Sequence, residues 1–217
     1  MRTGRVAKMA VIALCAIGAA TAIAATTKSN DTAGKAGDQT QAARGGTYRV
    51  EWEQSFGFTS GFDPTGEYSV QVFGLYSNLL VRTLVGYNHV AGAPGNLLVP
   101  DLATSLGTIS NGGHTYTFHL KQHVRFGPPL NREITSKDVA FAMQRIGTKA
   151  IGAQYGFYYD VIRGMTAFSS GKAKTIAGIR TPNARTIVFH LTRPTGDFRC
   201  RLAMPAAGPM PREVAGC

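Results

Sequence analysis

The sequence predicts a mixed α/β fold of the α+β kind, and two kinds of pattern support this. Residues 115–120 and 186–191 alternate apolar and polar side chains, which is typical of strands with one buried face. Residues 69–84 and 136–146 instead repeat apolar side chains every three or four positions, as amphipathic helices do. Because strands and helices do not follow one another in regular βαβ units, we expect a mixed architecture.

The composition bounds the class of protein. The 217 residues are 44% hydrophobic and 16% charged, which predicts that most of the chain folds around a buried core. Three of the 23 basic residues and none of the 12 acidic ones lie in residues 1–25, so the remainder carries a formal charge of +8. The basic residues are scattered and form no run of five, which argues against nucleic-acid binding. A cationic domain can still attract anionic lipid or acidic wall polymer.

The first 25 residues have the features of an export signal. Three basic residues precede an apolar stretch at 9–20, and Ala22-Ile23-Ala24 is a small-x-small cleavage site. The apolar stretch is short for a membrane span, which needs about 20 residues. Cys15 offers an alternative, a lipid-modified N-terminus, although Leu14 stands where such a signal prefers a small residue. We therefore expect an exported chain with a signal peptide at 1–25, either cleaved or kept as an N-terminal anchor, that lies in the periplasm or on the outer face of the cytoplasmic membrane.

The rest of the chain divides into a linker and a folded domain. Residues 26–45 contain almost no bulky apolar side chains and predict a flexible linker. The domain then occupies residues 46–217. Residues 47–53 alternate and are rich in Tyr, Val and Trp, which predicts a first strand. Val70, Phe73, Leu80 and Leu84 lie at helical spacing in the helix predicted at 69–84.

The next predicted strand follows a hairpin signal. Asn111-Gly112-Gly113 supplies residues that tolerate positive φ. In the strand at 115–120, Tyr116, Phe118 and Leu120 share one face, which we expect to be buried.

A capped helix and another strand complete the predicted elements. Thr135 or Ser136 is expected to cap a helix that has Asp138 at its third position, close to a capping box. Its inner face is predicted to carry Val139, Met143 and Ile146. Asn183-Ala184 predicts the turn before residues 186–191, whose inward side chains are Ile187, Phe189 and Leu191.

The titratable residues indicate no catalytic or metal centre. His119 and His123 are four residues apart, but on a strand that separation is about 13 Å, too far to share a metal. Glu51 and Glu53 share one face of the predicted first strand and could support acid–base chemistry, although an exposed strand edge is the commoner pattern. We therefore expect no enzyme activity and no cofactor.

Aromatic residues concentrate in two predicted loops. They are Trp52, Phe56, Phe58 and Phe62 in the first, and Tyr155, Phe157, Tyr158 and Tyr159 in the second. Such residues often fill a core. The alternative is a ligand cleft, where flat rings bury apolar area and hydroxyls keep a polar contact. The position in loops favours the cleft.

Short sequence pieces, taken in order, point to a family. They are Gly45–Val50, Gly61–Pro64, Leu79–Tyr87, Leu98–Ala103, Gly113–Lys121, Val124–Gly127, Ile134–Val139, Thr186–Leu191 and Met204–Pro205. In this order and spacing the chain resembles the family 5 extracellular solute-binding proteins, the oligopeptide- and dipeptide-binding group of ABC importers. It departs from the family pattern in the turn at 127–133 and in its much shorter length.

The resemblance implies both a fold and a function. The fold would be the first lobe of a two-lobed periplasmic-binding-protein-like (type II) structure, apparently truncated. The protein would be a monomeric binding component that captures peptides or similar solutes outside the membrane and delivers them to an ABC transporter permease through lobe closure. The residues expected nearest the cleft are Glu53, Phe56, Phe58, Asp63, Tyr158 and Tyr159. Asp63 has an alternative role, since Asp-Pro commonly builds a turn through its own side chain.

Two other interpretations stay open at this stage. The chain could be a secreted, non-catalytic cationic protein that holds wall polymer, in which case modest salt would abolish binding. It could also be an inactive truncated gene product, in which case the isolated chain would be unfolded.

Overall fold

A computed structural model of the protein describes residues 46–47, 49, 51, 58 and 61–215. The chain divides into two units, residues 1–49 and 50–217, and every helix and strand described here belongs to the second. The predicted signal peptide and linker lie outside the described residues, as does most of the predicted strand at 47–53.

The described chain combines short helices with short strands. The α-helices are α1 (Val70–Leu75), α2 (Ser136–Gly147), α3 (Met165–Ser169), α4 (Phe198–Arg201) and α5 (Arg212–Ala215). The strands are β1 (Val85–Tyr87), β2 (Leu98–Pro100), β3 (Thr108–Ser110), β4 (Thr115–His119), β5 (Ile179–Asn183) and β6 (Thr186–His190). A π-helical turn at Tyr76–Leu80 extends α1, and short 3₁₀ turns connect other elements. This mixture confirms the predicted fold class.

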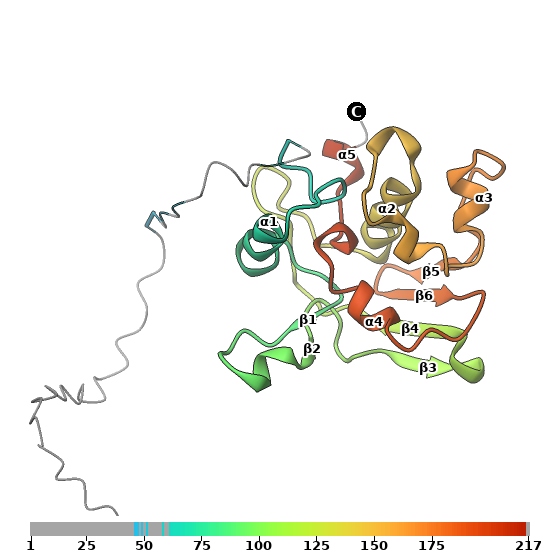
Figure 1. Ribbon diagram of the computed structural model, residues 1–217, viewed down its shortest axis with the longest axis horizontal. Coiled ribbons are helices and arrows are strands. Elements are labelled where there is room, and N and C mark those ends of the chain that lie inside the picture. The colour runs from blue at the N-terminus through green and yellow to red at the C-terminus, as the bar shows by residue number, and fades with distance from the viewer. Residues whose placement is uncertain (1–45, 48, 50, 52–57, 59–60, 216–217) are drawn as a thin grey trace, which may run out of the picture. The chain divides into compact units, whose positions relative to one another are not determined.

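An antiparallel sheet in the order β3-β4-β6-β5 forms one layer of the fold, and α2 and α3 lie on one side of it (Figure 1). The register places Tyr116 opposite Phe189 and Phe118 opposite Ile187. All four side chains are buried, so the alternation read from the sequence is confirmed together with the direction of its apolar face.

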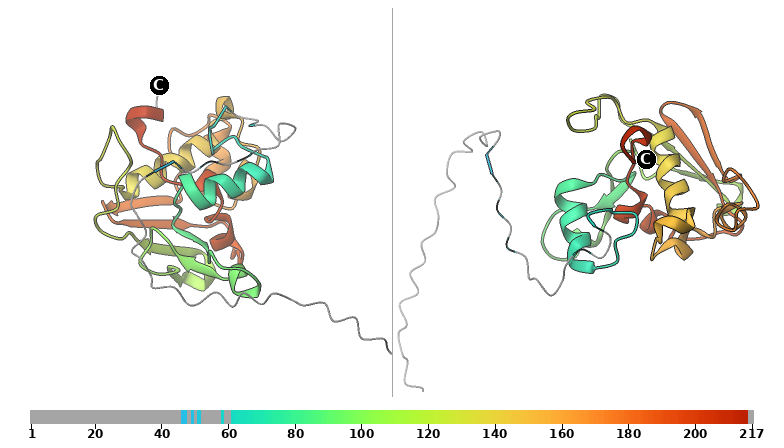
Figure 2. Two further views of the ribbon diagram at one scale, coloured as in Figure 1. Left: turned by 90° about the vertical axis from the view of Figure 1, so that its left-hand side faces the viewer. Right: turned by 90° about the horizontal axis from the view of Figure 1, so that it is seen from above.

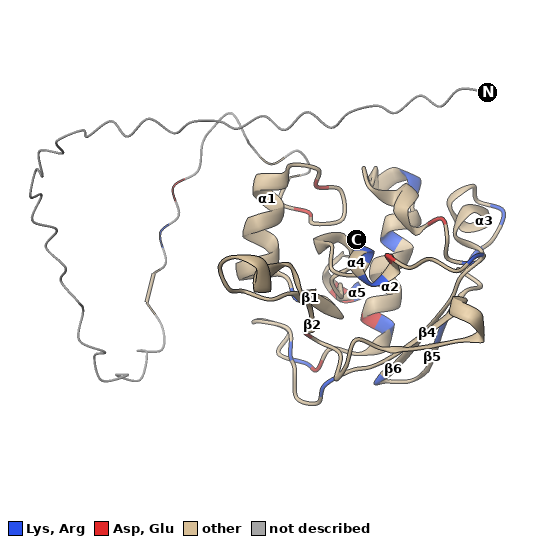
Figure 3. Ribbon diagram, turned by 60° about the horizontal axis from the view of Figure 1, so that its bottom comes forward, with Lys and Arg blue, Asp and Glu red and all other residues tan. Residues whose placement is uncertain are grey.

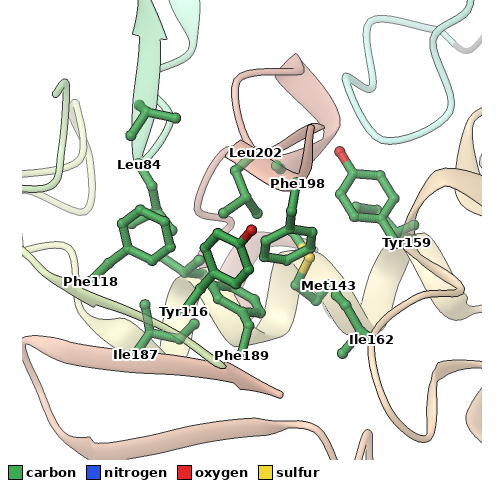
Figure 4. Close-up of a cluster of buried hydrophobic side chains, with 14 of the residues drawn as sticks. Leu84, Tyr116, Phe118, Met143, Tyr159, Ile162, Ile187, Phe189, Phe198 and Leu202 are labelled. Atoms are coloured by element: carbon green, nitrogen blue, oxygen red, sulfur yellow. The ribbon is translucent and has the colours of Figure 1, made fainter. Parts of the chain in front are cut away.

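The core lies between that face of the sheet and the helices (Figure 4). The ring of Phe118 is 6.2 Å from that of Phe189, which lies 5.4 Å from the ring of Phe198 on α4. Met143 of α2 belongs to the same core cluster. Long-range aromatic packing therefore joins β4, β6 and α4 into one unit.

Helix α2 begins where the sequence predicts. Thr135 is its N-cap and forms a capping box with Asp138, which satisfies free amide groups at the helix start. The predicted inner residues Val139, Met143 and Ile146 are all buried. Both predictions for this helix are therefore confirmed.

The helix predicted at 69–84 is shorter than expected. Helical structure ends at Leu80, and Val81 is extended. Asp101 holds the chain that follows: its carboxylate accepts hydrogen bonds from the Thr83 amide (3.1 Å) and the Arg82 guanidinium (2.7 Å). Leu84 is buried in the core next to β1 and is not part of a helix. The sequence pattern placed Leu84 on the apolar face of a helix, but its side chain packs in the core beside β1.

The hairpin β1–β2 and α1 stand on the other side of α2 from α3 (Figure 2). None of the helices in the described ranges is long and apolar enough to cross a membrane.

The C-terminal helix α5 is held by a charged network around Arg132. Its guanidinium donates to Glu213 of α5 at 2.6 and 2.8 Å, and to Asp138 of α2 at 2.7 and 2.9 Å. The hydrogen bonds from Arg132 are the main reason that the pKa of Glu213 falls from 4.5 to about 2. Arg132 therefore joins the two helices through carboxylates.

We expect the docking of α5 to depend on pH in the acid range. Because the pKa of Glu213 is depressed in the folded state, its contribution is fully present above 4.5 and is lost as the pH falls through about 2. The protection of the α5 amides, measured as their exchange rate relative to the intrinsic rate at each pH, should therefore fall across this window. In Glu213→Gln the protection should already be low at neutral pH and change little on acidification. Titration of Glu213 at its ordinary pKa, followed by carboxyl NMR shifts, would contradict the prediction.

Candidate ligand-binding face

A partly exposed group of rings, here called the aromatic face, consists of Tyr68, Phe73, Tyr155, Phe157 and Tyr158. Tyr155 lies at its centre, with ring centroids 6.1 Å from Tyr68, 5.5 Å from Phe73 and 5.9 Å from Tyr158. Its hydroxyl donates to the Tyr68 carbonyl at 3.3 Å. The face thus joins the segment before α1, α1 itself and the 3₁₀ turn at Gly156–Tyr159.

Two of these rings are open to solvent. Tyr68 is 56% exposed and Phe157 is 61% exposed, and the neighbouring Val70 is also exposed. Clustered exposed apolar side chains on a soluble domain commonly mark an interaction site. Tyrosine suits this role because its ring buries apolar area while its hydroxyl keeps a polar contact.

Glu67 fixes the backbone that presents Tyr68. Its side chain is buried and accepts hydrogen bonds from the amides of Tyr68 and Ser69, both at 2.8 Å. The two residues that lead into α1 are therefore held in one orientation relative to the buried carboxylate.

Beside the aromatic face lies a hollow of about 390 Å³, here called the Tyr158 hollow. It is lined by Phe157, Tyr158, Asp160, Val161, Thr192, Arg193 and Arg201. Arg201 lies over the Tyr158 ring, 5.5 Å from its centroid, and donates to the Tyr158 carbonyl at 2.5 Å. It also pairs with Asp197, so Arg193 and Asp160 are the exposed charges whose partners could come from a ligand.

Two further hollows adjoin the Arg82–Asp101 ion pair, with volumes of about 320 and 610 Å³. Ser77, Asn78, Val81, His89 and Asp101 line both of them. The hollow of about 610 Å³ is the larger of the two, but few aromatic side chains line it. The carboxylate of Asp101 in its lining is already bound by Arg82. We therefore favour the aromatic face as the ligand-binding region.

The predicted site residues have different positions in the structure. Tyr158 is half-buried and lines the Tyr158 hollow, and its role in ligand binding stays a prediction. Phe58 is also half-buried, with its ring 4.5 Å from that of Phe62 and 6.3 Å from that of Tyr76. It thus belongs to a different ring cluster from Tyr158. Glu53 and Phe56 lie outside the described residues.

Tyr159 requires a correction. Its side chain is fully buried in the core, and its hydroxyl donates to the Arg201 carbonyl at 2.7 Å. Burial raises its pKa. Three aromatic residues in succession, Phe157 to Tyr159, cannot all face a cleft on a short turn, and Tyr159 is the one that anchors the turn to the core.

Asp63 stabilises a turn and also pairs with an arginine of α2. One carboxylate oxygen accepts the Thr65 amide at 2.9 Å, which is the Asp-Pro turn considered from the sequence. The other pairs with Arg145 of α2, which also donates to the Ala215 carbonyl at 2.6 Å. Both oxygens have structural partners, so Asp63 connects the loop to α2.

Tyr76 is a buried neighbour of this loop. Burial is the main cause that raises its pKa to about 12, with smaller contributions from the charges of Glu67 and Asp63. Among the described residues its hydroxyl has no hydrogen-bond partner. The sequence did not single out this tyrosine, because it lies within the apolar periodicity of the predicted helix.

His119 and His123, the pair considered as possible metal ligands, each contact a different residue. His119 lies 3.2 Å from the Thr186 hydroxyl, and His123 lies 3.1 Å from the Glu133 carboxylate. Within the described ranges no group of three His, Cys, Asp or Glu residues is arranged to hold a metal ion.

Sequence reasoning missed Tyr68 and Phe73 as partners of the second aromatic segment. Phe73 fitted the helical spacing of a core residue, and Tyr68 stood alone between polar neighbours. Neither residue lies in the two predicted aromatic loops, and the fold brings both of them to the second loop through Tyr155.

Comparison with known proteins identifies the family. Residues 98–215, more than half of the chain, match the family described as bacterial extracellular solute-binding proteins, family 5 Middle. The chain belongs to this family.

Individual relatives agree with this assignment. The dipeptide-binding protein of Escherichia coli (strain K12) is 31% identical over 166 residues, covering 73% of this chain and 27% of the relative. A dipeptide-binding protein of Pseudomonas aeruginosa is 28% identical, with coverages of 75% and 30%. The solved clavulanic acid biosynthesis oligopeptide binding protein 2 superposes with a TM-score of 0.66 at 33% identity, covering 73% of this chain and 29% of that structure. The chain thus spans about three tenths of the length of these relatives.

Proposed function

We propose that this chain is part of the substrate-binding component of an ABC importer, and that it captures peptides outside the membrane for delivery to a permease. Family membership and the peptide-binding names of the relatives support the proposal. The structural observation that carries it is the exposed aromatic face beside the Tyr158 hollow. The proposed role is binding without chemical conversion, in an exported and monomeric protein that does not use nucleic acid.

The chemistry of the region suits a short peptide. The exposed rings of Tyr68 and Phe157, together with the half-buried ring of Tyr155, can cover apolar side chains of a ligand. In the hollow, Asp160 could accept a peptide ammonium group and Arg193 could donate to its carboxylate, since both are exposed at the rim. Binding on one surface alone should be weak, because a ligand held on one side keeps much of its area in water.

A peptide titration of the chain tests the proposal. We expect dipeptides and tripeptides to bind with a Kd of about 1 mM, seen as saturable NMR shifts of Tyr68, Tyr155 and Phe157 signals. Tyr155→Ala removes the central ring and should weaken binding about tenfold. Tyr155→Phe keeps the ring and should weaken it by less.

Tyr87→Ala is the matched control, since Tyr87 is an exposed tyrosine on β1. Its affinity should equal that of the unaltered chain. Equal losses in both alanine variants, or shifts that saturate only around the hollows beside Arg82 and Asp101, would show that the aromatic face is not the ligand site. A folded chain without saturable peptide binding would refute the proposed function.

A further inference from the structure

We propose that the side of the fold formed by α3, β5 and β6 binds anionic lipid headgroups at a membrane surface. Residues 161–192 contain no acidic side chain and include five basic ones, here called the cationic face: Arg163, Lys172, Lys174, Arg180 and Arg185. Figure 3 shows basic positions around α3 and along β5 and β6. This inference does not depend on the peptide site.

The five side chains of the cationic face are all exposed. Within the part of the chain that the structure describes, none of them forms a side-chain hydrogen bond or an ion pair. Other arginines behave differently: Arg82, Arg132, Arg145 and Arg201 all pair with carboxylates. The carboxylates that pair with these arginines lie outside residues 161–192, so the five charges of the cationic face have no acidic residue of their own segment to compensate them.

Backbone geometry brings two of these charges to the same place. Arg180 of β5 lies opposite Val188 of β6, two residues from His190 on the same face of the sheet. The Arg163 amide donates to the His190 carbonyl at 2.9 Å, which places Arg163 at the same site. Burial, assisted by the charges of Arg163 and Arg180, lowers the pKa of His190. The positive charges of Arg163 and Arg180 therefore act on His190 as well.

The arrangement fits a bilayer better than a nucleic acid. Binding of single strands relies on exposed aromatic rings for base stacking. The two aromatic residues in this segment, Phe168 and Phe189, pack in or against the core. The charges are instead spread singly over an edge strand and loops, so a planar anionic surface can meet several together. Each basic residue near such a surface multiplies the affinity, and the attraction weakens with salt.

The test measures sedimentation of the full chain with vesicles. We expect binding to vesicles of equal phosphatidylglycerol and phosphatidylcholine at about 0.01 M salt, and its loss at about 1 M, where charges are screened beyond about 3 Å. Vesicles of phosphatidylcholine alone should bind far less. The triple variant Lys172→Gln, Arg180→Gln, Arg185→Gln should bind the anionic vesicles about a hundredfold more weakly.

A second triple variant separates this face from net charge. Lys121→Gln, Lys137→Gln and Lys149→Gln remove three exposed charges elsewhere, and the N-terminal segment is the same in both variants. This control should lose less than about threefold in affinity. Equal losses in the two triples would overturn the proposal, as would absence of vesicle binding at low salt. Binding of inorganic polyphosphate or single-stranded DNA through the same three residues, without vesicle binding, would also overturn it.

Discussion

Replacing Phe189 by alanine is expected to lower the free energy of unfolding by about 3–5 kcal/mol. Phe189 is fully buried on β6 and contacts the rings of Phe118 and Phe198, so truncation leaves a cavity where the sheet meets α4. A domain of this size is stable by only about 5–15 kcal/mol. Urea unfolding followed by circular dichroism should show a large fall in the midpoint with an unchanged slope.

Ile109→Ala is the matched control for that prediction. Ile109 lies on β3 of the same sheet but is 44% exposed. Its removal should change the free energy of unfolding by less than about 1 kcal/mol. A comparable loss in both variants would mean that the sheet is not anchored by the ring cluster around Phe189.

Asp138→Ala should be the second most damaging change, with an expected loss of about 2–4 kcal/mol. The nearly buried carboxylate accepts hydrogen bonds from the Thr135 amide (2.8 Å) and from two nitrogens of Arg132 (2.7 and 2.9 Å). Its removal takes away the helix cap and leaves Arg132 with Glu213 as its remaining carboxylate. Thermal unfolding by circular dichroism measures the loss.

Two variants separate the parts played by Asp138. Asp138→Asn keeps acceptor capacity for the cap but loses the charge facing Arg132, so it should fall between the wild type and the alanine variant. Glu133→Ala removes an exposed carboxylate that contacts His123 and should cost less than about 1 kcal/mol. If Asp138→Ala cost no more than Glu133→Ala, the capping network would not stabilise the fold.

The sequence predicted well those elements whose two faces differ strongly. In β4 and β6, alternation identified the strands and their buried side chains. In α2, the capping residues and the apolar repeat identified both the start and the inner face. These signals are local, because pleat and helical period fix which side chains share a face.

Elements that depend on distant partners were predicted less well. Strand β3 is exposed along its length, and β5 contains Pro182, so neither has a strong strand pattern. They form because β4 and β6 offer hydrogen-bonding edges. The end of the π-helical turn at Leu80 likewise depends on Asp101, which lies 18 residues beyond Thr83 and binds its amide.

The candidate site shows the same limit. The sequence identified an aromatic segment at 155–159 but not which of its rings are buried. Phe157 is exposed, whereas Tyr159 is buried. The contact of Tyr68 with Tyr155 spans 87 residues and has no local signature. Asp63 was recognised as a turn residue, whereas its pairing with Arg145 required the fold.

By itself, the sequence determined the mixed fold class, the inward faces of α2, β4 and β6, and the resemblance to solute-binding proteins. The tertiary structure alone decided the order of the sheet, the assembly of the aromatic face, and which cations remain unpaired on the side of α3, β5 and β6. The physical reason is the separation along the chain over which each interaction acts. Backbone periodicity and capping act between residues a few positions apart, whereas ring packing and ion pairing join side chains that only the folded chain brings within a few ångströms.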